Sequence, residues 1–371
     1  MPKKRGPATA GRRRPDATYY HNYILREDEL PPLGLRGMQS PYGTGRQAHH
    51  DEHLFIVTHQ TYELWFKQMI EDITRPETGL AGCLRHGDLH EAVRLLRRLT
   101  KITQILTDQY RVIETLAPSD FLVFRDVLRP SSGYDSAQWR ALELMGGLRE
   151  DGSYLLHLVG EVPARGAGPA SLAPRVAAAR RAAERGRPAP LRGYSLVRKM
   201  AAARDVNGLA LVERAVEKPS LRELAYQAVQ RADIRGPTRS RLEERAWMKA
   251  RAAEFAAETD IARAEGRPHD ISVDPPTAAD IERRVVALYR RHTEGAKRGL
   301  EERALFDLVE ALVEFDEAMR NLRSVHIHMV LRVIGGKEGT GGSTGARYLR
   351  TTLDYCFFPL LWRARDQMEG P

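Results

Sequence analysis

The stretch from Asn321 to Arg350, NLRSVHIHMVLRVIGGKEGTGGSTGARYLR, decides the fold that we expect for this chain. One face of a 3.6-residue helical repeat carries apolar side chains and one histidine: Leu322, His326, Met329 and Val333. The glycines at 335–336 should end this helix. The backbone of the glycine-rich loop that follows, Gly339 to Gly345, can approach a ligand closely. The stretch therefore predicts a histidine near a ligand-binding loop, unless that histidine is only a hydrogen-bonded core residue.

A second histidine lies in another apolar stripe, between His49 and Ile70. The segment reads HHDEHLFIVTHQTYELWFKQMI, and Asp51 is its candidate N-cap. Four side chains share one helical face, namely Phe55, His59, Tyr62 and Phe66. The histidines at 49, 50 and 53 have no HExxH motif and no nearby cysteine, so we interpret them as a polar helix start rather than a metal cluster.

Helical periodicity continues through most of the chain. The expected helices cover 88–116, 137–148, 176–184, 220–231, 239–264, 278–291 and 300–324. A further helix begins after the Ala-Pro-Ser sequence at 117–119, with Phe121 and Phe124 facing inward and Arg125 beside them. Strand signals and internal repeats are absent. We therefore expect an all-α helical bundle that forms a single domain over residues 18–371.

Composition limits the class of protein. With 371 residues and 42% hydrophobic side chains, the chain can bury a large core, and no apolar run is long enough to span a membrane. The basic N-terminus is not followed by the hydrophobic segment of a secretory signal. Cys83 and Cys356 do not form a disulfide framework or a metal knuckle. We therefore expect a cytoplasmic protein with no membrane partner.

Two segments depart from this composition. Residues 1–17 form a basic, Pro/Gly/Ala-rich arm that contributes much of the net charge of +9. No nucleic-acid-binding motif follows the arm, so we interpret it as a disordered, solvated tail without a nucleic-acid partner. Residues 160–215 are expected to be a variable insertion, and the Ala/Arg/Gly/Pro-rich part at 160–192 is predicted to lie on the surface outside the core.

The chemistry of these residues points to a bound anion. A buried guanidinium such as Arg125 beside two neutral imidazoles is costly unless an anion accompanies it, and a carboxylate would pair with it. The hydroxyl of Thr340 could orient an amine. One imidazole could bind haem iron, and the other could face a substrate as a hydrogen-bonding or acid/base group. This is the chemistry of a haem enzyme that acts on an amino acid, although spacing alone does not prove it.

At these residues the sequence resembles the tryptophan 2,3-dioxygenase family. The resemblance covers residues 18–158 and 219–365. The matching segments are HDEHLFIVTHQTYELWFKQ (50–68), FRDVLRPSSGYDSAQWR (124–140), PSL (219–221), HMVLRVIGGKEGTGGSTGARYLRTTL (328–353) and FFPLLW (357–362). The resemblance implies an all-helical fold, a homotetramer and a haem b cofactor. It also implies a reaction of tryptophan catabolism, in which dioxygen opens the indole ring of L-tryptophan to give N-formylkynurenine.

The resemblance also implies roles for individual residues. His326 aligns with the proximal haem ligand and His59 with the distal histidine that meets the indole N–H. Arg125 aligns with the arginine that binds the substrate carboxylate. The other implied site residues are Phe55 and Phe121 in the indole pocket, Thr340 and Gly341 at the substrate ammonium, Ser132 beside the haem, and Tyr20 and Tyr23 at a neighbouring subunit's pocket.

One departure leaves alternatives open. Family members usually carry Trp-Arg-x-Arg just before the proximal histidine, whereas this chain has Leu-Arg-Ser-Val at 322–325. A changed proximal side can alter how oxygen chemistry partitions. The chain could instead be a haem monooxygenase of the same superfamily, making an oxindole or hydroxylated product from tryptophan, a substituted tryptophan or another aromatic amino acid. A non-catalytic haem sensor is the other alternative, and the presence of His59, Arg125 and Thr340 argues against it.

Overall fold

The computed structural model describes residues 49–128, 135–160, 172–189, 195–232, 234, 241–293, 299–340 and 344–368. Within these ranges the regular structure is helical and no strand occurs, apart from one isolated bridge between Asp151 and Asp270. The expected all-α fold class is therefore confirmed. The basic arm at 1–17 lies outside the described residues, so its expected disorder stays a prediction. No described helix is long and apolar enough to cross a membrane.

The described part of the chain forms a succession of α-helices. In chain order they are α1 (His50–Thr74), α2 (Leu80–His86), α3 (Leu89–Ile113), α4 (Pro118–Phe124), α5 (Ala137–Gly146), α6 (Gly152–Val159), α7 (Ala173–Glu184), α8 (Leu196–Ala202), α9 (Val206–Glu217), α10 (Leu221–Arg231), α11 (Arg241–Ala264), α12 (Pro275–Thr293), α13 (Leu300–Ile334), α14 (Ala346–Thr351) and α15 (Pro359–Asp366). Two 3-10 helices, η3 (Arg125–Leu128) and η5 (Leu148–Glu150), follow α4 and α5.

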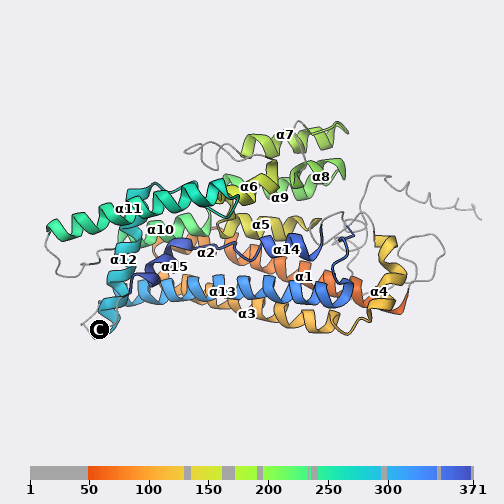
Figure 1. The fold of residues 1–371 in the computed structure, drawn as a ribbon, viewed down its shortest axis with the longest axis horizontal. Coiled ribbons are helices and arrows are strands. Elements are labelled where there is room, and N and C mark those ends of the chain that lie inside the picture. Colours follow the sequence, from red (N-terminus) through yellow and green to blue (C-terminus); the bar gives the residue numbers. More distant parts are fainter. Residues whose placement is uncertain are drawn as a thin grey trace, which may run out of the picture.

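Helix α13 is the longest described helix and runs along α3 through the body of the molecule (Figure 1). It contains no glycine or proline, so nothing in its sequence interrupts the backbone hydrogen bonds. It begins after Gly299 and ends at Gly335, whose φ of 62° lies in the left-handed region that glycine adopts easily. The predicted end at 335–336 is therefore confirmed.

Helix α1 also packs on α3, and its start differs from the prediction. The N-cap is His49, whose ring Nδ1 accepts a hydrogen bond from the backbone N–H of Asp51 at 3.3 Å. The Glu52 carboxylate accepts from the His49 backbone N–H at 3.3 Å. These two hydrogen bonds provide acceptors for backbone N–H groups at the start of the helix, which have no partner within the helix itself. Asp51, the expected cap, therefore lies inside the first turn.

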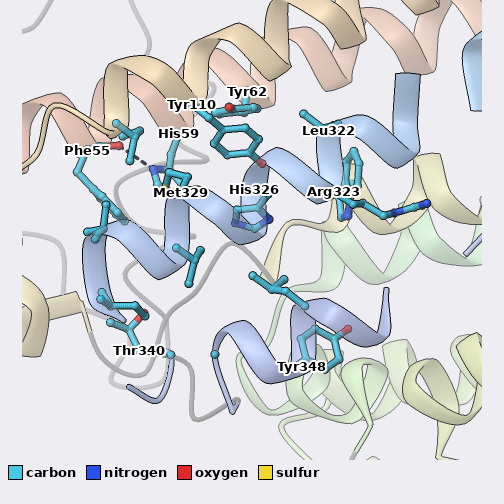
Figure 2. Close-up of a pocket in the computed structure, with 18 of the residues that line it drawn as sticks. Phe55, His59, Tyr62, Tyr110, Leu322, Arg323, His326, Met329, Thr340 and Tyr348 are labelled. Atoms are coloured by element: carbon cyan, nitrogen blue, oxygen red, sulfur yellow. Dashed lines mark hydrogen bonds between the residues drawn. The ribbon is translucent and has the colours of Figure 1, made fainter. Parts of the chain in front are cut away.

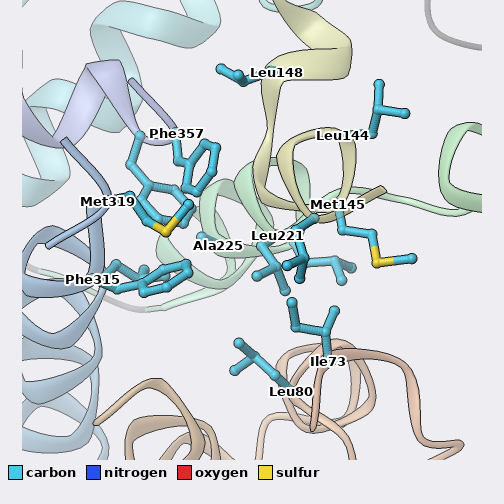
Figure 3. Packing of buried hydrophobic residues seen from close by; sticks show 14 of the residues in the cluster. Ile73, Leu80, Leu144, Met145, Leu148, Leu221, Ala225, Phe315, Met319 and Phe357 are labelled. Carbon is cyan, nitrogen blue, oxygen red and sulfur yellow. The ribbon is translucent and has the colours of Figure 1, made fainter. Parts of the chain in front are cut away.

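The main hydrophobic core joins helices that are far apart in sequence. Figure 3 shows the meeting of α1 and α2 with α5, α10, α13 and the segment before α15. Met69, Leu80, Leu144 and Met319 are fully buried in it. A second, smaller cluster lies around α4 and the adjoining ends of α1, α3 and α13, and it includes Phe124. The two clusters form the framework around the cavity described below.

The expected surface insertion is in part a core element. In α7, Val176 and Ala179 are fully buried, and α7 packs against α9, which itself packs on α5. Met200 of α8 and Val212 of α9 join the same core cluster. The prediction that 160–192 lies outside the core is therefore wrong for α7. The many arginines suggested an exposed helix, but the small alanines between them form a continuous face that permits close helix packing.

Candidate active site

Six residues that were singled out in the sequence line one cavity in the structure. They are Phe55, His59, Phe121, Arg125, His326 and Thr340. The cavity runs along α13, with α1 and α3 on one side, α4, η3 and the loop after α13 at one end, and α5 and α14 at the other (Figure 2). Helix α13 supplies the face that carries Leu322, His326, Met329 and Val333, as the periodicity predicted.

His326 has the environment of a neutral metal-binding imidazole. Desolvation, together with smaller electrostatic effects of His59 and Arg140, lowers its pKa to about 4, so the ring is uncharged at neutral pH. The Tyr110 ring stacks on it, with centroids 5.0 Å apart and planes 5° from parallel. Among the described residues no group forms a hydrogen bond with the His326 ring. A ring nitrogen with a lone pair therefore lies at the cavity wall.

His59 is fixed in a different way. Its Nδ1 lies 2.7 Å from the carbonyl oxygen of Phe55, one helical turn earlier. A carbonyl oxygen only accepts, so Nδ1 carries the proton and Nε2 has the lone pair. Burial lowers the pKa of His59, which keeps the ring neutral. The Phe55 ring packs against the His59 ring at 4.1 Å between centroids, so the imidazole presents an acceptor beside an aromatic wall.

Arg125 brings a buried positive charge to the same space. Its side chain is 9% exposed, and its Nη2 donates to the carbonyl oxygen of Glu338 in the loop after α13. Its Nε forms no hydrogen bond within the described part of the chain. Thr340 lines the cavity on this same loop. A guanidinium with a buried, unbonded N–H is costly, and a ligand carboxylate would satisfy it.

Comparison with known proteins decides the family. The family described as tryptophan 2,3-dioxygenase matches residues 8–154 and 288–368, which is more than half of the chain. The tryptophan 2,3-dioxygenase of Anaeromyxobacter dehalogenans is 31% identical over 323 residues, covering 87% of this chain and 89% of the relative. The chain belongs to the tryptophan 2,3-dioxygenase family. The expected family and enzyme class, an oxidoreductase of the dioxygenase type, are thereby confirmed.

Other relatives give the same family name. A tryptophan 2,3-dioxygenase of a Nocardioides species is 30% identical over 319 residues, or 86% of each chain. The tryptophan 2,3-dioxygenase of Myxococcus xanthus is 28% identical over 357 residues, covering 95% of this chain and 91% of the relative. The family match leaves out residues 155–287, which include the expected insertion at 160–215.

The family implies haem, and the site residues fit it. A neutral, half-buried imidazole whose ring forms no hydrogen bond with the described residues is suited to bind haem iron. His59 lines the same cavity from a different helix, as Figure 2 shows. Aromatic and aliphatic walls, including Phe66 and Met329, suit the apolar faces of a porphyrin.

Four expected site residues lie outside the described ranges, namely Tyr20, Tyr23, Ser132 and Gly341. The structure therefore leaves their expected roles as predictions. Three charged residues that the sequence did not single out as site residues also line the cavity: Arg140, Glu143 and Arg323. Arg140 and Glu143 lie three residues apart on α5, on a helix that is otherwise largely apolar and buried. A charged pair at this spacing on an apolar helix, next to Trp139, is the sequence feature that could have identified Arg140 and Glu143 as cavity residues.

Proposed function

We propose that this protein binds haem b through His326 and catalyses the dioxygenation of L-tryptophan at the indole C2–C3 bond, which yields N-formylkynurenine. One observation carries the proposal. The neutral His326 ring, the hydrogen-bonded His59 and the buried Arg125 line a single cavity, in a chain of the tryptophan 2,3-dioxygenase family. Bound haem would supply the redox chemistry by which dioxygen reacts with the substrate.

The loop end of the cavity is the proposed binding site for the amino-acid part of the substrate. Arg125 donates to the carboxylate, which satisfies its unbonded Nε. Thr340, and Gly341 next to it in the sequence, bind the ammonium group from the glycine-rich loop. The rings of Phe55 and Phe121, with centroids 5.9 Å apart, pack on the indole. This arrangement selects a flat aromatic amino acid over an amine or an acid alone.

His59 positions the indole ring. Because Nδ1–H is engaged by the Phe55 carbonyl, Nε2 accepts a hydrogen bond from the indole N–H. A lowered pKa keeps His59 in its accepting form at neutral pH. Orientation of a reacting bond within a near-attack geometry contributes several orders of magnitude to rate. His59 therefore acts by holding the indole C2–C3 bond in place, rather than by removing a proton.

The remaining family features are part of the same proposal. Ser132 lies beside the haem, Tyr20 and Tyr23 close the pocket of a neighbouring subunit, and the protein is a cytoplasmic homotetramer. These assignments are supported by the family membership and by the motifs that surround them in the sequence.

The product of a tryptophan incubation tests the proposal. We expect the purified, haem-loaded protein to add two oxygen atoms to L-tryptophan and to give the absorption spectrum of N-formylkynurenine. Tryptamine, which lacks the carboxylate, should be turned over at least about tenfold less efficiently, because a charge-assisted pair with Arg125 is lost. The measurement is mass spectrometry with ¹⁸O₂ combined with initial rates for both substrates.

One variant and two alternative outcomes test the separate parts of the proposal. The His326→Ala variant should lose haem and product together, whereas a variant with full haem content and a wild-type spectrum would remove His326 as the ligand. A product that carries one oxygen atom would replace dioxygenation by mono-oxygenation. Equal turnover of tryptamine and tryptophan would contradict the role of Arg125.

A further inference from the structure

The two cavity histidines differ in what fixes the plane of the ring. His59 has its Nδ1 2.7 Å from the carbonyl oxygen of Phe55, one helical turn earlier. Helix α13 offers His326 the carbonyl oxygen of Leu322 at the same spacing, but the ring forms no hydrogen bond with it or with any other described residue. A histidine that binds a metal usually donates its second ring N–H to an acceptor, which fixes the plane of the ring. In the described part of the chain, a different contact has to do this for His326.

The ring of Tyr110 makes this contact. Tyr110 lies on α3, and its ring plane is within 5° of that of His326, with the two ring centroids 5.0 Å apart. This distance and angle describe an offset stack, which aromatic rings prefer to a face-to-face sandwich. Rotation of the imidazole about its Cβ–Cγ bond would tilt it out of the stack. The Tyr110 ring therefore restricts the orientation of the His326 ring.

Tyr62 of α1 supports Tyr110, which lies between it and His326 (Figure 2). The centroids of the two tyrosine rings are 5.3 Å apart. The Tyr62 hydroxyl donates to the carbonyl oxygen of Leu106 at 2.7 Å, one turn before Tyr110 on α3, so Tyr62 is anchored to the helix that carries Tyr110. Burial raises the pKa of both phenols, so neither adds a negative charge beside His326. Tyr110 therefore cannot turn away from the imidazole without losing its packing on Tyr62.

We propose that Tyr110 is a positioning residue for the iron ligand, and that its ring sets the plane of the His326 imidazole as a hydrogen-bond acceptor does for most metal-bound histidines. The inference rests on the proposed function, because it takes His326 as the haem ligand. A stack differs from an acceptor in one respect. It fixes the ring without drawing on the N–H proton, so it does not raise the basicity of the ligand as a hydrogen bond does.

Two substitutions at Tyr110 test this role in the haem-loaded protein. Tyr110→Phe keeps the ring, so the iron–histidine stretching band of the ferrous protein, measured by resonance Raman spectroscopy, should keep its position and width. Tyr110→Leu removes the stack, so this band should shift or broaden because the imidazole takes up several orientations. Haem transfer to an excess of apomyoglobin should be roughly 2- to 10-fold faster for Tyr110→Leu, and should change by less than about twofold for Tyr110→Phe.

The Phe315→Leu variant is the matched control. It removes a ring of similar size that is 2% exposed on α13 but does not line the cavity, so the protein loses core packing while the band stays as in the wild type. A wild-type band and transfer rate for Tyr110→Leu would overturn the proposal. An equal change in Tyr110→Phe would also overturn it, because the hydroxyl and not the ring would then matter. The same holds if Phe315→Leu changes the band as much as Tyr110→Leu does.

A measurement on the wild-type apoprotein needs no destabilising variant. In protein with ¹³C-labelled histidine rings, the His326 signal is the one that the His326→Ala spectrum lacks. Its ring protons should lie upfield of those of the exposed His90 and His328, because the Tyr110 ring current shields them. A signal at the position of the exposed histidines would overturn the stack and the proposal with it. Failure of the wild type to bind haem would instead contradict the proposed function, whereas haem binding with an unchanged band in Tyr110→Leu would contradict only the role of Tyr110.

Discussion

At the scale of single residues, the two half-buried histidines of the cavity differ in the contacts that already hold them. His59 is held by the Phe55 carbonyl, so its tautomer and ring orientation are set before a ligand arrives. The His326 ring forms no hydrogen bond within the described residues and only stacks on Tyr110. One ring is therefore prepared as an acceptor for a substrate, and the other is prepared as a ligand for a metal centre.

The His59→Ser substitution should separate positioning from proton transfer. We expect the variant to bind haem as the wild type does and to retain measurable turnover of tryptophan, reduced by up to about 100-fold because the indole is held less well. 1-Methyltryptophan, which has no indole N–H, should be used relatively better by the variant than by the wild type. The ratio of kcat/KM for the two substrates is the measurement. Intact haem with no product from any indole would instead make His59 an essential acid or base.

At the scale of one element, α13 joins the cavity to the C-terminal segment. Asp316, two turns before the cavity-lining face, is fully buried. Its carboxylate accepts from the backbone N–H groups of Phe357 and Phe358 at 2.9 and 3.2 Å, and from the indole N–H of Trp362 at 3.0 Å. It also accepts from the thiol of Cys356 at 2.9 Å, and burial and this carboxylate raise the pKa of that thiol. One carboxylate thus fixes the start of α15 on α13.

The Asp316→Asn substitution should destabilise the protein strongly. An amide of the same shape has one oxygen where the carboxylate has two, and its NH₂ group faces donors, so several charge-assisted bonds are lost. We expect a fall of roughly 2–4 kcal/mol in the free energy of unfolding, measured by urea denaturation. The exposed Asp354 provides a control, since Asp354→Asn should change this quantity by less than about 0.5 kcal/mol. Equal stability of the two variants would contradict the role of Asp316.

At the scale of the whole molecule, a buried ionic cluster connects four segments that are distant in sequence. Arg222 of α10 is 1% exposed, and it donates to Asp270 at 3.0 Å and to the carbonyl oxygens of Cys356 and Phe357 at 2.8 and 2.6 Å. Glu150 of η5 lies in the same region and is also 1% exposed. The cluster therefore links α10, η5, the segment before α12 and the C-terminal segment.

Glu150 makes the stability of this arrangement depend on pH. Burial, opposed by the charges of Arg222 and Arg149, raises the pKa of Glu150 from 4.5 to about 7. The folded protein then binds this proton more tightly than the unfolded chain does. The free energy of unfolding should therefore fall as pH rises from about 4.5 to about 7, by on the order of 3 kcal/mol, and should stay lower above that range.

The Glu150→Gln variant tests this sign. The variant cannot ionise at this position, so its thermal midpoint should rise relative to the wild type on going from pH 5 to pH 8. Calorimetry at both pH values gives the difference, and all groups shared by the two proteins cancel in it. The Glu71→Gln variant, at a 51% exposed glutamate, should show no such change between the two pH values. A difference that falls or stays constant for Glu150→Gln would contradict a raised pKa.

Periodicity determined most of the helices and the composition of the cavity wall. The stripes that carry His59 and His326 follow the 3.6-residue repeat, and Gly335 ends α13 where the sequence predicts, because these features depend only on neighbours within a few turns. The sequence did not predict His49 as the N-cap of α1, because a histidine ring nitrogen accepts the backbone hydrogen bond that a carboxylate usually accepts. It also did not predict the burial of α7, because a face of alanines becomes part of the core only when another helix covers it.

Only the tertiary structure decided which separate segments share a cavity. The sequence identified Arg125 and Thr340 as candidates, but the fold brings η3 and the loop after α13 together and leaves the Nε of Arg125 buried without a hydrogen bond among the described residues. The contacts of Arg323 have the same origin, since its partners Glu143 and Tyr355 come from distant parts of the chain. Local spacing determines which side chains share a helix face, whereas burial and pKa depend on everything that packs against that face.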